Sequence, residues 1–157
     1  TITLPLTIDF EASSTLNEHH AHDQAKLAGM NILLAEDNDL NREIALFILT
    51  EAGAKATCAD DGFKALSAFE QAEAGTFDLI LMDIMMPNMN GYEATRAIRS
   101  LSREDARTIP IVAMSANAFT EDKVRCREAG MDGHLTKPID SDKLIDALAK
   151  IMAAKEG

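Results

Sequence analysis

Positive charge is scarce in this chain, and so are cysteines and long apolar runs. Its 157 residues include 15 Lys and Arg against 26 Asp and Glu, a formal net charge of −11. This balance argues against a nucleic-acid-binding surface, which needs a basic patch, and favours a domain with an acidic, cation-binding pocket. No apolar run approaches the roughly 20 residues of a membrane-spanning helix. Apolar residues still make up 46% of the chain, enough for the core of one domain.

The only two cysteines, Cys58 and Cys126, lie far apart and form no CxxC pair. We therefore expect small buried or half-buried thiols in a reducing compartment and no disulfide. Three histidines gather near the N-terminus, at His19, His20 and His22. They lack a carboxylate or cysteine partner at metal-ligand spacing, so a solvated linker is expected there.

A regular alternation of two patterns begins near residue 29. Apolar segments of strand length alternate with segments whose apolar residues recur at helical spacing, and glycines follow several of the latter. The expected strands cover residues 30–36, 54–59, 77–83, 109–114 and 131–136. The expected helices cover residues 39–52, 62–74, 92–101, 119–129 and 141–153.

Strict alternation of apolar strands with helices predicts an α/β domain whose parallel sheet is covered on both faces. We expect a flavodoxin-like, doubly wound sheet of five strands in the order 2-1-3-4-5, with five helices. In that order the topological switch point lies between the first and third strands. Ligands of open α/β sheets bind outside the carboxyl ends of the strands, so chemistry is expected at this edge.

Residues 1–28 differ in pattern from the rest. Residues 1–10 alternate polar and apolar side chains around Pro5, as in an edge strand, and residues 11–28 are polar and rich in Ala and His. The expected organisation is therefore residues 1–10 from a preceding domain, a linker over residues 11–28, and a compact domain over residues 29–157.

Chemistry-bearing side chains stand at the carboxyl ends of four expected strands. Glu36 and Asp37 follow the first strand, Asp83 ends the third, Ser115 follows the fourth and Lys137 follows the fifth. Three carboxylates at one edge repel one another unless a cation lies among them. Hard oxygen ligands suit Mg²⁺, and a lysine and a hydroxyl suit an anion. Together they predict a phosphoryl site with Asp83 as nucleophile.

Four short segments carry a resemblance to a known family. They are LAEDN at 34–38, LMDIMMP at 81–87, MSANA at 114–118 and LTKP at 135–138. Each is weak alone, but in this order and at these strand ends they are specific. From residue 30 to about 152 the chain resembles the receiver (response-regulator) domains of two-component signalling.

The resemblance implies a role for each matching residue. Asp83 would accept a phosphoryl group from a phosphohistidine of a histidine kinase or a histidine phosphotransfer domain. Asp37 would bind Mg²⁺ directly, Glu36 would act through a water, and the carbonyl of Met85 would be a further ligand beside Asp83. Lys137 would pair with the phosphoryl oxygens or with Asp83. The acidic pair is Glu-Asp here in place of the family's Asp-Asp, which leaves metal binding intact.

Three more positions match residues that the family uses for switching and for shape. Ser115 would hydrogen-bond the phosphoryl group, and His134 stands where the family carries a rotating aromatic switch. Pro138 would follow a cis peptide bond. Residues 1–10 resemble the last strand of a histidine-kinase ATP-binding domain. They imply a hybrid sensor kinase whose cytoplasmic portion carries the receiver, and they leave open whether the parent is anchored in a membrane.

Each of these residues also has an ordinary structural interpretation. Asp83 could cap a helix and Ser115 a turn, Lys137 could be a solvated surface lysine, and His134 a strand-end histidine without function. The methionines at 85, 86 and 89 fit loop packing better than a cofactor site. It is the clustering of the charged residues at one edge that favours the functional interpretation.

Other functional classes remain open at this point. A stand-alone response regulator fits the same motifs. An aspartate-nucleophile phosphatase would need a second acid two residues after Asp83, where this chain has Met85. A flavodoxin-like cofactor binder would need a phosphate-binding loop after the first strand, where Glu36 and Asp37 would repel phosphate.

The expected helix over residues 39–52 is apolar on more than one side. Its expected inward face carries Leu40, Ile44, Phe47, Ile48 and Glu51, which leaves Ala45, Leu46 and Leu49 on the far side. That far side packs under a neighbouring loop or forms a docking face for the four-helix bundle of a phosphotransfer partner.

Overall fold

A five-stranded sheet forms the centre of the domain. The computed structural model describes residues 27–116, 120–137 and 139–156, without the side chains of residues 120–122 and 152–156. The strands are β1 (Asn31–Ala35), β2 (Lys55–Ala59), β3 (Leu79–Asp83), β4 (Ile111–Ser115) and β5 (Gly133–Thr136). The helices in these ranges are α2 (Asp39–Glu51), α3 (Gly62–Gln71), α4 (Gly91–Arg99), α5 (Glu104–Thr108), α6 (Thr120–Ala129) and α7 (Ser141–Glu156).

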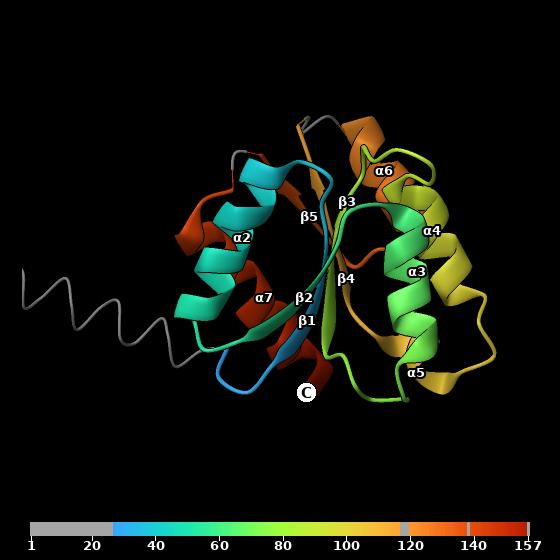
Figure 1. Cartoon of the computed structure of the whole chain (residues 1–157), viewed down its shortest axis with the longest axis horizontal. Helices are drawn as coiled ribbons and strands as arrows, with labels where there is room; N and C mark the ends of the chain where they lie inside the picture. The colour runs from blue at the N-terminus through green and yellow to red at the C-terminus, as the bar shows by residue number, and fades with distance from the viewer. Residues whose placement is uncertain (1–26, 117–119, 138, 157) are drawn as a thin grey trace, which may run out of the picture.

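The strand order is β2-β1-β3-β4-β5, and every neighbouring pair is parallel. This confirms the predicted flavodoxin-like sheet. Helices α2 and α7 lie on one face of the sheet, and α3, α4 and α6 lie on the other (Figure 1). The three central strands are therefore covered on both sides, which explains why their sequences are continuously apolar.

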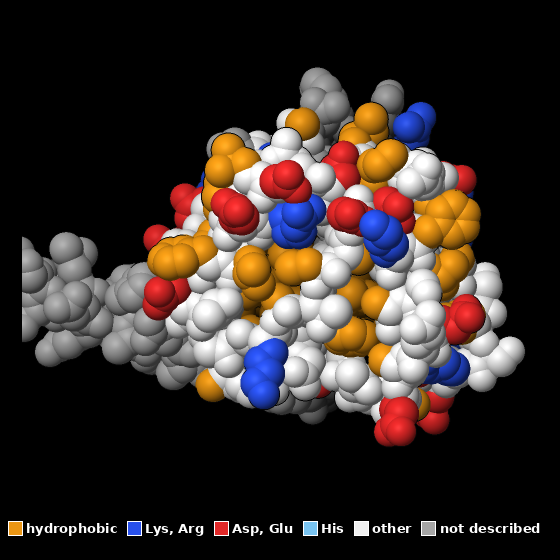
Figure 2. All heavy atoms as spheres, in the orientation of Figure 1, with side chains coloured by type: hydrophobic (Ala, Val, Ile, Leu, Met, Phe, Trp, Pro, Cys, Tyr) orange, Lys and Arg blue, Asp and Glu red, His pale blue; other side chains and the backbone are white. Residues whose placement is uncertain are grey.

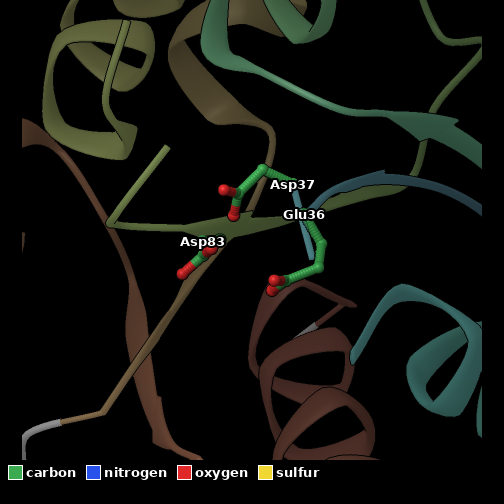
Figure 3. Close-up of side chains that lie close together, drawn as sticks. All are labelled: Glu36, Asp37 and Asp83. Atoms are coloured by element: carbon green, nitrogen blue, oxygen red, sulfur yellow. The ribbon is translucent and has the colours of Figure 1, made fainter. Parts of the chain in front are cut away.

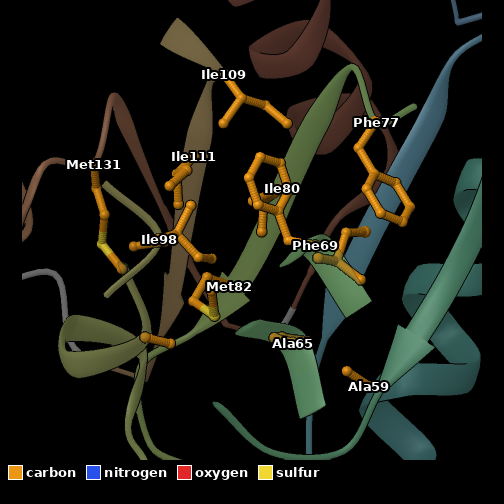
Figure 4. Close-up of a cluster of buried hydrophobic side chains, with 14 of the residues drawn as sticks. Ala59, Ala65, Phe69, Phe77, Ile80, Met82, Ile98, Ile109, Ile111 and Met131 are labelled. Atoms are coloured by element: carbon orange, nitrogen blue, oxygen red, sulfur yellow. The ribbon is translucent and has the colours of Figure 1, made fainter. Parts of the chain in front are cut away.

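Side chains of the central strands alternate between two cores. In β1, Leu33 and Ala35 join the core beneath α3 and α4, whereas Ile32 and Leu34 join the core beneath α2 and α7. Figure 4 shows the first of these cores, where Ile80, Met82 and Ile111 meet the apolar side chains of the covering helices, Ile98 among them. Two packed faces hold each strand in register, because a shift by one residue would exchange all of its side chains between the cores.

The structure adds one helix that the sequence pattern did not predict. The described ranges hold six helices where five were expected, and the sixth is α5, a single short turn before β4. Its sequence, EDART, has no apolar periodicity, and only Ala106 is buried. Tertiary contacts hold it, including a hydrogen bond from Arg99 to the carbonyl of Ala106 at 3.0 Å.

Two further expectations meet the structure here. Both cysteines are free, as predicted; Cys126 is buried, but Cys58 is exposed on the edge strand β2, against the expected burial. None of the helices in the described part of the chain combines the length and apolar character of a membrane span. The expected strand at residues 1–10 and the linker up to residue 26 lie outside the described residues.

Candidate functional site

The predicted carboxylates meet at the carboxyl edge of the sheet. Ala35 of β1 pairs with Met82 of β3, so the residues that follow, Glu36 and Asp83, lie side by side. Glu36, Asp37 and Asp83 each offer an oxygen atom within 4.8 Å of the other two. Figure 3 shows the three side chains converging from the ends of β1 and β3. The strand order creates this cluster, because these strands are neighbours only in the folded sheet.

Lys137 completes the cluster from the far end of the chain. Its Nζ lies 2.8 Å from Oε2 of Glu36 and 3.1 Å from Oδ1 of Asp83. The backbone holds it there, because the amide of Lys137 donates to the carbonyl of Ser115 at 2.7 Å, which continues the pairing of β5 with β4. One lysine thus faces two carboxylates that are almost fully buried, with exposures of 1% for Glu36 and 2% for Asp83.

This imbalance of charge shifts the titration of the site. Burial, followed by the negative charge of Glu36, raises the pKa of Asp83 to about 7, against the opposing effect of Lys137. Burial also opposes the charge of Lys137, but its contacts with Glu36 and Asp83 outweigh that effect and raise its pKa. The negative charges of the cluster therefore outweigh the positive charge of Lys137, and the raised pKa leaves Asp83 partly protonated at neutral pH.

One buried oxygen of Glu36 receives no hydrogen bond from the described residues. Oε1 accepts from the amide of Asn38 at 3.2 Å and from Lys137 at 3.1 Å. Oε2 has the ammonium group nearby but no donor in hydrogen-bonding geometry. A buried carboxylate oxygen rarely stays unsatisfied. Three carboxylates with a free oxygen fit a hard divalent cation such as Mg²⁺ with its bound waters.

The sequence did not identify the residues that hold Glu36 in place. Arg42 donates from Nη1 to the backbone carbonyl of Glu36 at 3.0 Å. Asn38 binds the Glu36 carboxylate through its amide and caps α2 by accepting from the amide of Asn41 at 2.9 Å. Asn38 had a recognisable signal as a helix N-cap beside an acidic pair. Arg42 had no such signal, because its bond to the carbonyl of Glu36 depends on how the chain turns from β1 into α2.

Ser115 and His134 form a direct contact. Ser115 is buried at the end of β4, and its Oγ lies 2.7 Å from Nε2 of the half-buried His134 on β5. Either group donates, according to the protonation of the ring. The sequence singled out both residues separately, and the sheet pairing brings them together.

The expected docking residues on α2 require a correction. Ala45 and Leu49 are buried, and Leu46 is half-buried against the core beneath α2. The exposed apolar residues of this helix are instead Leu40, Ile44 and Phe47, with exposures of 65%, 40% and 62%. Both sets recur at helical spacing, so the pattern could not tell which one faces the sheet. Of the residues placed inward, only Ile48 is buried.

Two other predicted positions have different outcomes. The side chain of Met85 is exposed, whereas Met86 is buried and Met89 packs against the core, so the methionines at 86 and 89 serve packing, as expected. Pro138, predicted to follow a cis peptide bond, lies outside the described residues.

Comparison with known proteins places this chain in a family. The model of the response regulator receiver domain matches residues 32–149. The chain belongs to this family. The receiver domain of the sensor histidine kinase PA1611 from Pseudomonas aeruginosa PAO1, solved with magnesium in its active site cleft, is 37% identical. Its TM-score is 0.71, and the match covers 80% of this chain and 99% of that one. The chemotaxis protein CheY4 of Vibrio cholerae superposes with a TM-score of 0.72 at 29% identity, covering 79% of this chain and 99% of that one.

Curated relatives of this receiver domain are much longer proteins. Histidine kinase 1 of Arabidopsis thaliana is 36% identical over a match covering 82% of this chain and 13% of that protein. The sensor histidine kinase RcsC of Salmonella typhi is 39% identical, covering 76% of this chain and 12% of that protein. The chain thus spans a small fraction of the length of the relatives that it matches.

Proposed function

We propose that this receiver domain accepts a phosphoryl group on Asp83 from a phosphohistidine, with Mg²⁺ as cofactor. The observation that carries the proposal is the buried carboxylate of Asp83 beside Lys137 and the acidic pair of β1. A buried carboxylate with too little positive charge around it is unfavourable for packing. It becomes a suitable nucleophile once cations offset the negative charge of its neighbours.

The transfer follows from this geometry. An ionised oxygen of Asp83 attacks the phosphorus atom, the bond from phosphorus to the imidazole nitrogen breaks, and the imidazole leaves with the electron pair. Lys137 then exchanges its contact with Asp83 for one with the phosphoryl oxygens. The work of the site is positioning and charge compensation.

Four groups would hold the metal. Asp37 and Asp83 would bind it directly, Glu36 through a water, and Met85 through its backbone carbonyl. The bound cation would offset negative charge on the phosphoryl oxygens. The clustered carboxylates and the unsatisfied oxygen of Glu36 support this assignment, as does the magnesium in the cleft of the PA1611 receiver.

The contact between Ser115 and His134 would report phosphorylation. Ser115 ends β4, one residue beyond the Met114 that pairs with Asp83 of β3, and its hydroxyl would donate to a phosphoryl oxygen. It would then leave His134, whose ring would lose the contact at 2.7 Å and reorient. Such a rearrangement is a two-state shift triggered by a local charge.

The wider setting of the domain belongs to the same proposal. Relatives that are histidine kinases, one of them a hybrid signal transduction kinase of Dictyostelium discoideum, support a parent hybrid kinase. The receiver would lie in the cytoplasmic portion of that parent. The donor or acceptor would be a histidine kinase or a histidine phosphotransfer domain. An aspartate-nucleophile phosphatase is disfavoured, because Met85 supplies no acid two residues after Asp83.

Adduct formation tests the acceptor role. Incubation with Mg²⁺ and acetyl phosphate should add one phosphoryl group to the chain, detected by intact mass. Asp83→Asn should abolish the adduct, and the same substitution at the exposed Asp142 should leave it unchanged. Phosphorylation that persists in Asp83→Asn would contradict the assignment.

The exposed face of α2 suggests how the partner approaches. Leu40, Ile44 and Phe47 form an apolar strip on the helix that follows Glu36 and Asp37, and the exposed acids Asp39 and Glu43 flank it. Figure 2 shows apolar side chains exposed over α2 with acidic side chains beside them. A partner helix with an apolar centre and a basic rim would fit this strip.

Replacement of Phe47 tests this docking face. Phe47→Glu should slow transfer from a phosphohistidine protein at least tenfold, because it puts a charge into the apolar contact, while acetyl phosphate should still modify Asp83 at the normal rate. Val124→Glu, at an exposed apolar residue on the opposite side of the sheet, is the matched control. Equal transfer rates for the two variants would count against the strip.

A further inference from the structure

A second buried aspartate stands at the same edge of the sheet, outside the cluster of Glu36, Asp37 and Asp83. Asp61 precedes α3, and only 7% of it is exposed. Its Oδ1 accepts from the amide of Lys64 at 2.8 Å, which caps the helix. Its Oδ2 accepts from the side-chain amide of Asn88 at 3.0 Å, across 27 residues of sequence. Both bonds, the helix cap first, lower the pKa of Asp61 below its ordinary value.

Asn88 lies in the loop that leaves the Asp83 strand. Its φ of 68° places it in the left-handed region, which asparagine tolerates better than most residues. The next residue, Met89, accepts at its carbonyl from the amide of Gly62 at 3.1 Å. A Cβ atom at position 62 would come within 2.3 Å of that carbonyl oxygen, so the two loops meet backbone to backbone. The start of α3 and the loop after Asp83 are thus joined at two adjacent points.

Packing alone does not hold the outer part of this loop. Met86 is buried, but Met85, Pro87 and Asn88 are all exposed. The loop ends where the amide of Gly91 donates to the carbonyl of Ile84 at 2.9 Å. Within the loop, the amide of Met89 donates to the carbonyl of Pro87 at 2.7 Å, and Met89 packs against the core. The bonds of Asn88 to Asp61 and of Met89 to Gly62 join the loop to the start of α3. A helix cap needs only one oxygen of Asp61, and the second oxygen serves the loop.

We propose that Asp61 is a positioning residue for the metal site, holding the loop of residues 84–90 through Asn88 so that the backbone of Met85 stays at the site. The inference rests on the proposed function, in which the carbonyl of Met85 is a metal ligand. A loop free to move would lose entropy on each binding event, whereas a loop already fixed does not. Asp61 therefore raises the affinity for Mg²⁺ without touching the ion.

Asn88→Gly is the cleanest test, because glycine keeps the left-handed backbone and removes only the bond to Asp61. The dissociation constant for Mg²⁺, measured by titration calorimetry on the full chain, should rise about tenfold. The melting temperature without metal should fall modestly as well, because Oδ2 of the buried Asp61 loses its partner. A merely structural role would lower the melting temperature in the same way but leave the Mg²⁺ affinity unchanged.

Exchanging Asp61 and Asn88 should restore the Mg²⁺ affinity that the loss of their hydrogen bond removes. Asn88→Asp sets two carboxylates against each other and should weaken Mg²⁺ binding more than Asn88→Gly does. Adding Asp61→Asn restores one hydrogen bond with donor and acceptor exchanged, and asparagine still caps α3. The double variant should recover most of the wild-type affinity.

The outcomes separate the inference from the proposed function. Wild-type Mg²⁺ affinity in Asn88→Gly, or no recovery in the double variant, would overturn the role of Asp61 and leave the acceptor role of Asp83 intact. A wild-type chain that neither binds Mg²⁺ nor forms the Asp83 adduct would overturn both.

Discussion

The two edges of the sheet differ in how far their buried charges are compensated. At the carboxyl edge, the ammonium group of Lys137 faces two buried carboxylates, and within the described ranges one oxygen of Glu36 has no hydrogen bond. At the amino edge, near α5, Arg103 and Asp105 form a bidentate pair at 3.0 and 2.9 Å. The first end leaves charge uncompensated, and the second compensates it fully.

Every polar group of the amino-edge pair serves the packing around it. Arg103 donates to the carbonyls of Phe69 at 2.8 Å and Glu70 at 3.2 Å, near the end of α3, and its guanidinium lies 4.7 Å from the centre of the Phe69 ring. Asp105 accepts from the amide of Gly75 at 3.1 Å. Although burial opposes its ionisation, the bonds from Arg103 and Gly75 lower the pKa of Asp105.

The difference shows which end is built for stability and which for binding. The lowered pKa of Asp105 means that its ionised form stabilises the fold above its unfolded pKa, and that this is lost as the pH falls through its folded pKa. The pKa of Asp83, raised to about 7, has the opposite sign: its ionisation weakens the fold as the pH rises from about 4 to 7. A shortage of positive charge around buried carboxylates is useful only where a cation is to be bound.

The largest expected effect is at the amino edge. Arg103→Ala removes the pair with Asp105, two carbonyl contacts and the stacking on Phe69, and should lower the free energy of unfolding by about 3 kcal/mol in urea denaturation. Arg107→Ala, at an exposed residue of α5, should change it by less than about 0.5 kcal/mol. Equal effects of the two substitutions would contradict the stabilising role of the Arg103–Asp105 pair at the amino edge.

The next effect should have the opposite sign. Without divalent cations at pH 8, Asp83→Asn should raise the free energy of unfolding by about 2 kcal/mol. The substitution removes a charge that the fold holds unfavourably, and the loss of an ion-pair partner of Lys137 offsets part of that gain. The gain should disappear at pH 4, where Asp83 is protonated in the native state. Asp105→Asn, measured alongside, should destabilise at pH 8. A gain from Asp83→Asn that does not depend on pH would show that charge is not its cause.

The smallest effect sharpens the role of the carboxyl edge. A proton on Asp83 competes with Mg²⁺, so the dissociation constant for Mg²⁺ should rise about tenfold between pH 8 and pH 6 for a group with a pKa of about 7. Calorimetric titration at both values checks this. Asp83→Asn should bind more weakly and show little of the dependence. A flat profile in the wild-type chain would mean that Asp83 is ionised throughout this range.

Much of the fold could be predicted from the sequence, because its signals are local. Continuously apolar strands separated by helices imply a parallel sheet with two covered faces, and the predicted order is the one observed. The convergence of Glu36, Asp37 and Asp83 followed from the same step, since each stands at a carboxyl strand end. The short helix α5 could not be predicted, because its own sequence carries no pattern and the bond from Arg99 to Ala106 that holds it forms only in the folded chain.

Sequence by itself determined the strands, their order and the residues that end them, because periodicity and parallel pairing together bring those ends to one edge. Tertiary structure decided the rest. Packing determines which apolar stripe of α2 faces the sheet: Ala45 and Leu49 are buried, and Phe47 is exposed. The sequence could not decide this, because both stripes fit the helical period. Tertiary structure also paired Lys137 with Glu36, 101 residues away, and left Oε2 of Glu36 without a hydrogen bond from the described residues. Such pairings depend on distances across the folded sheet, which no local pattern contains.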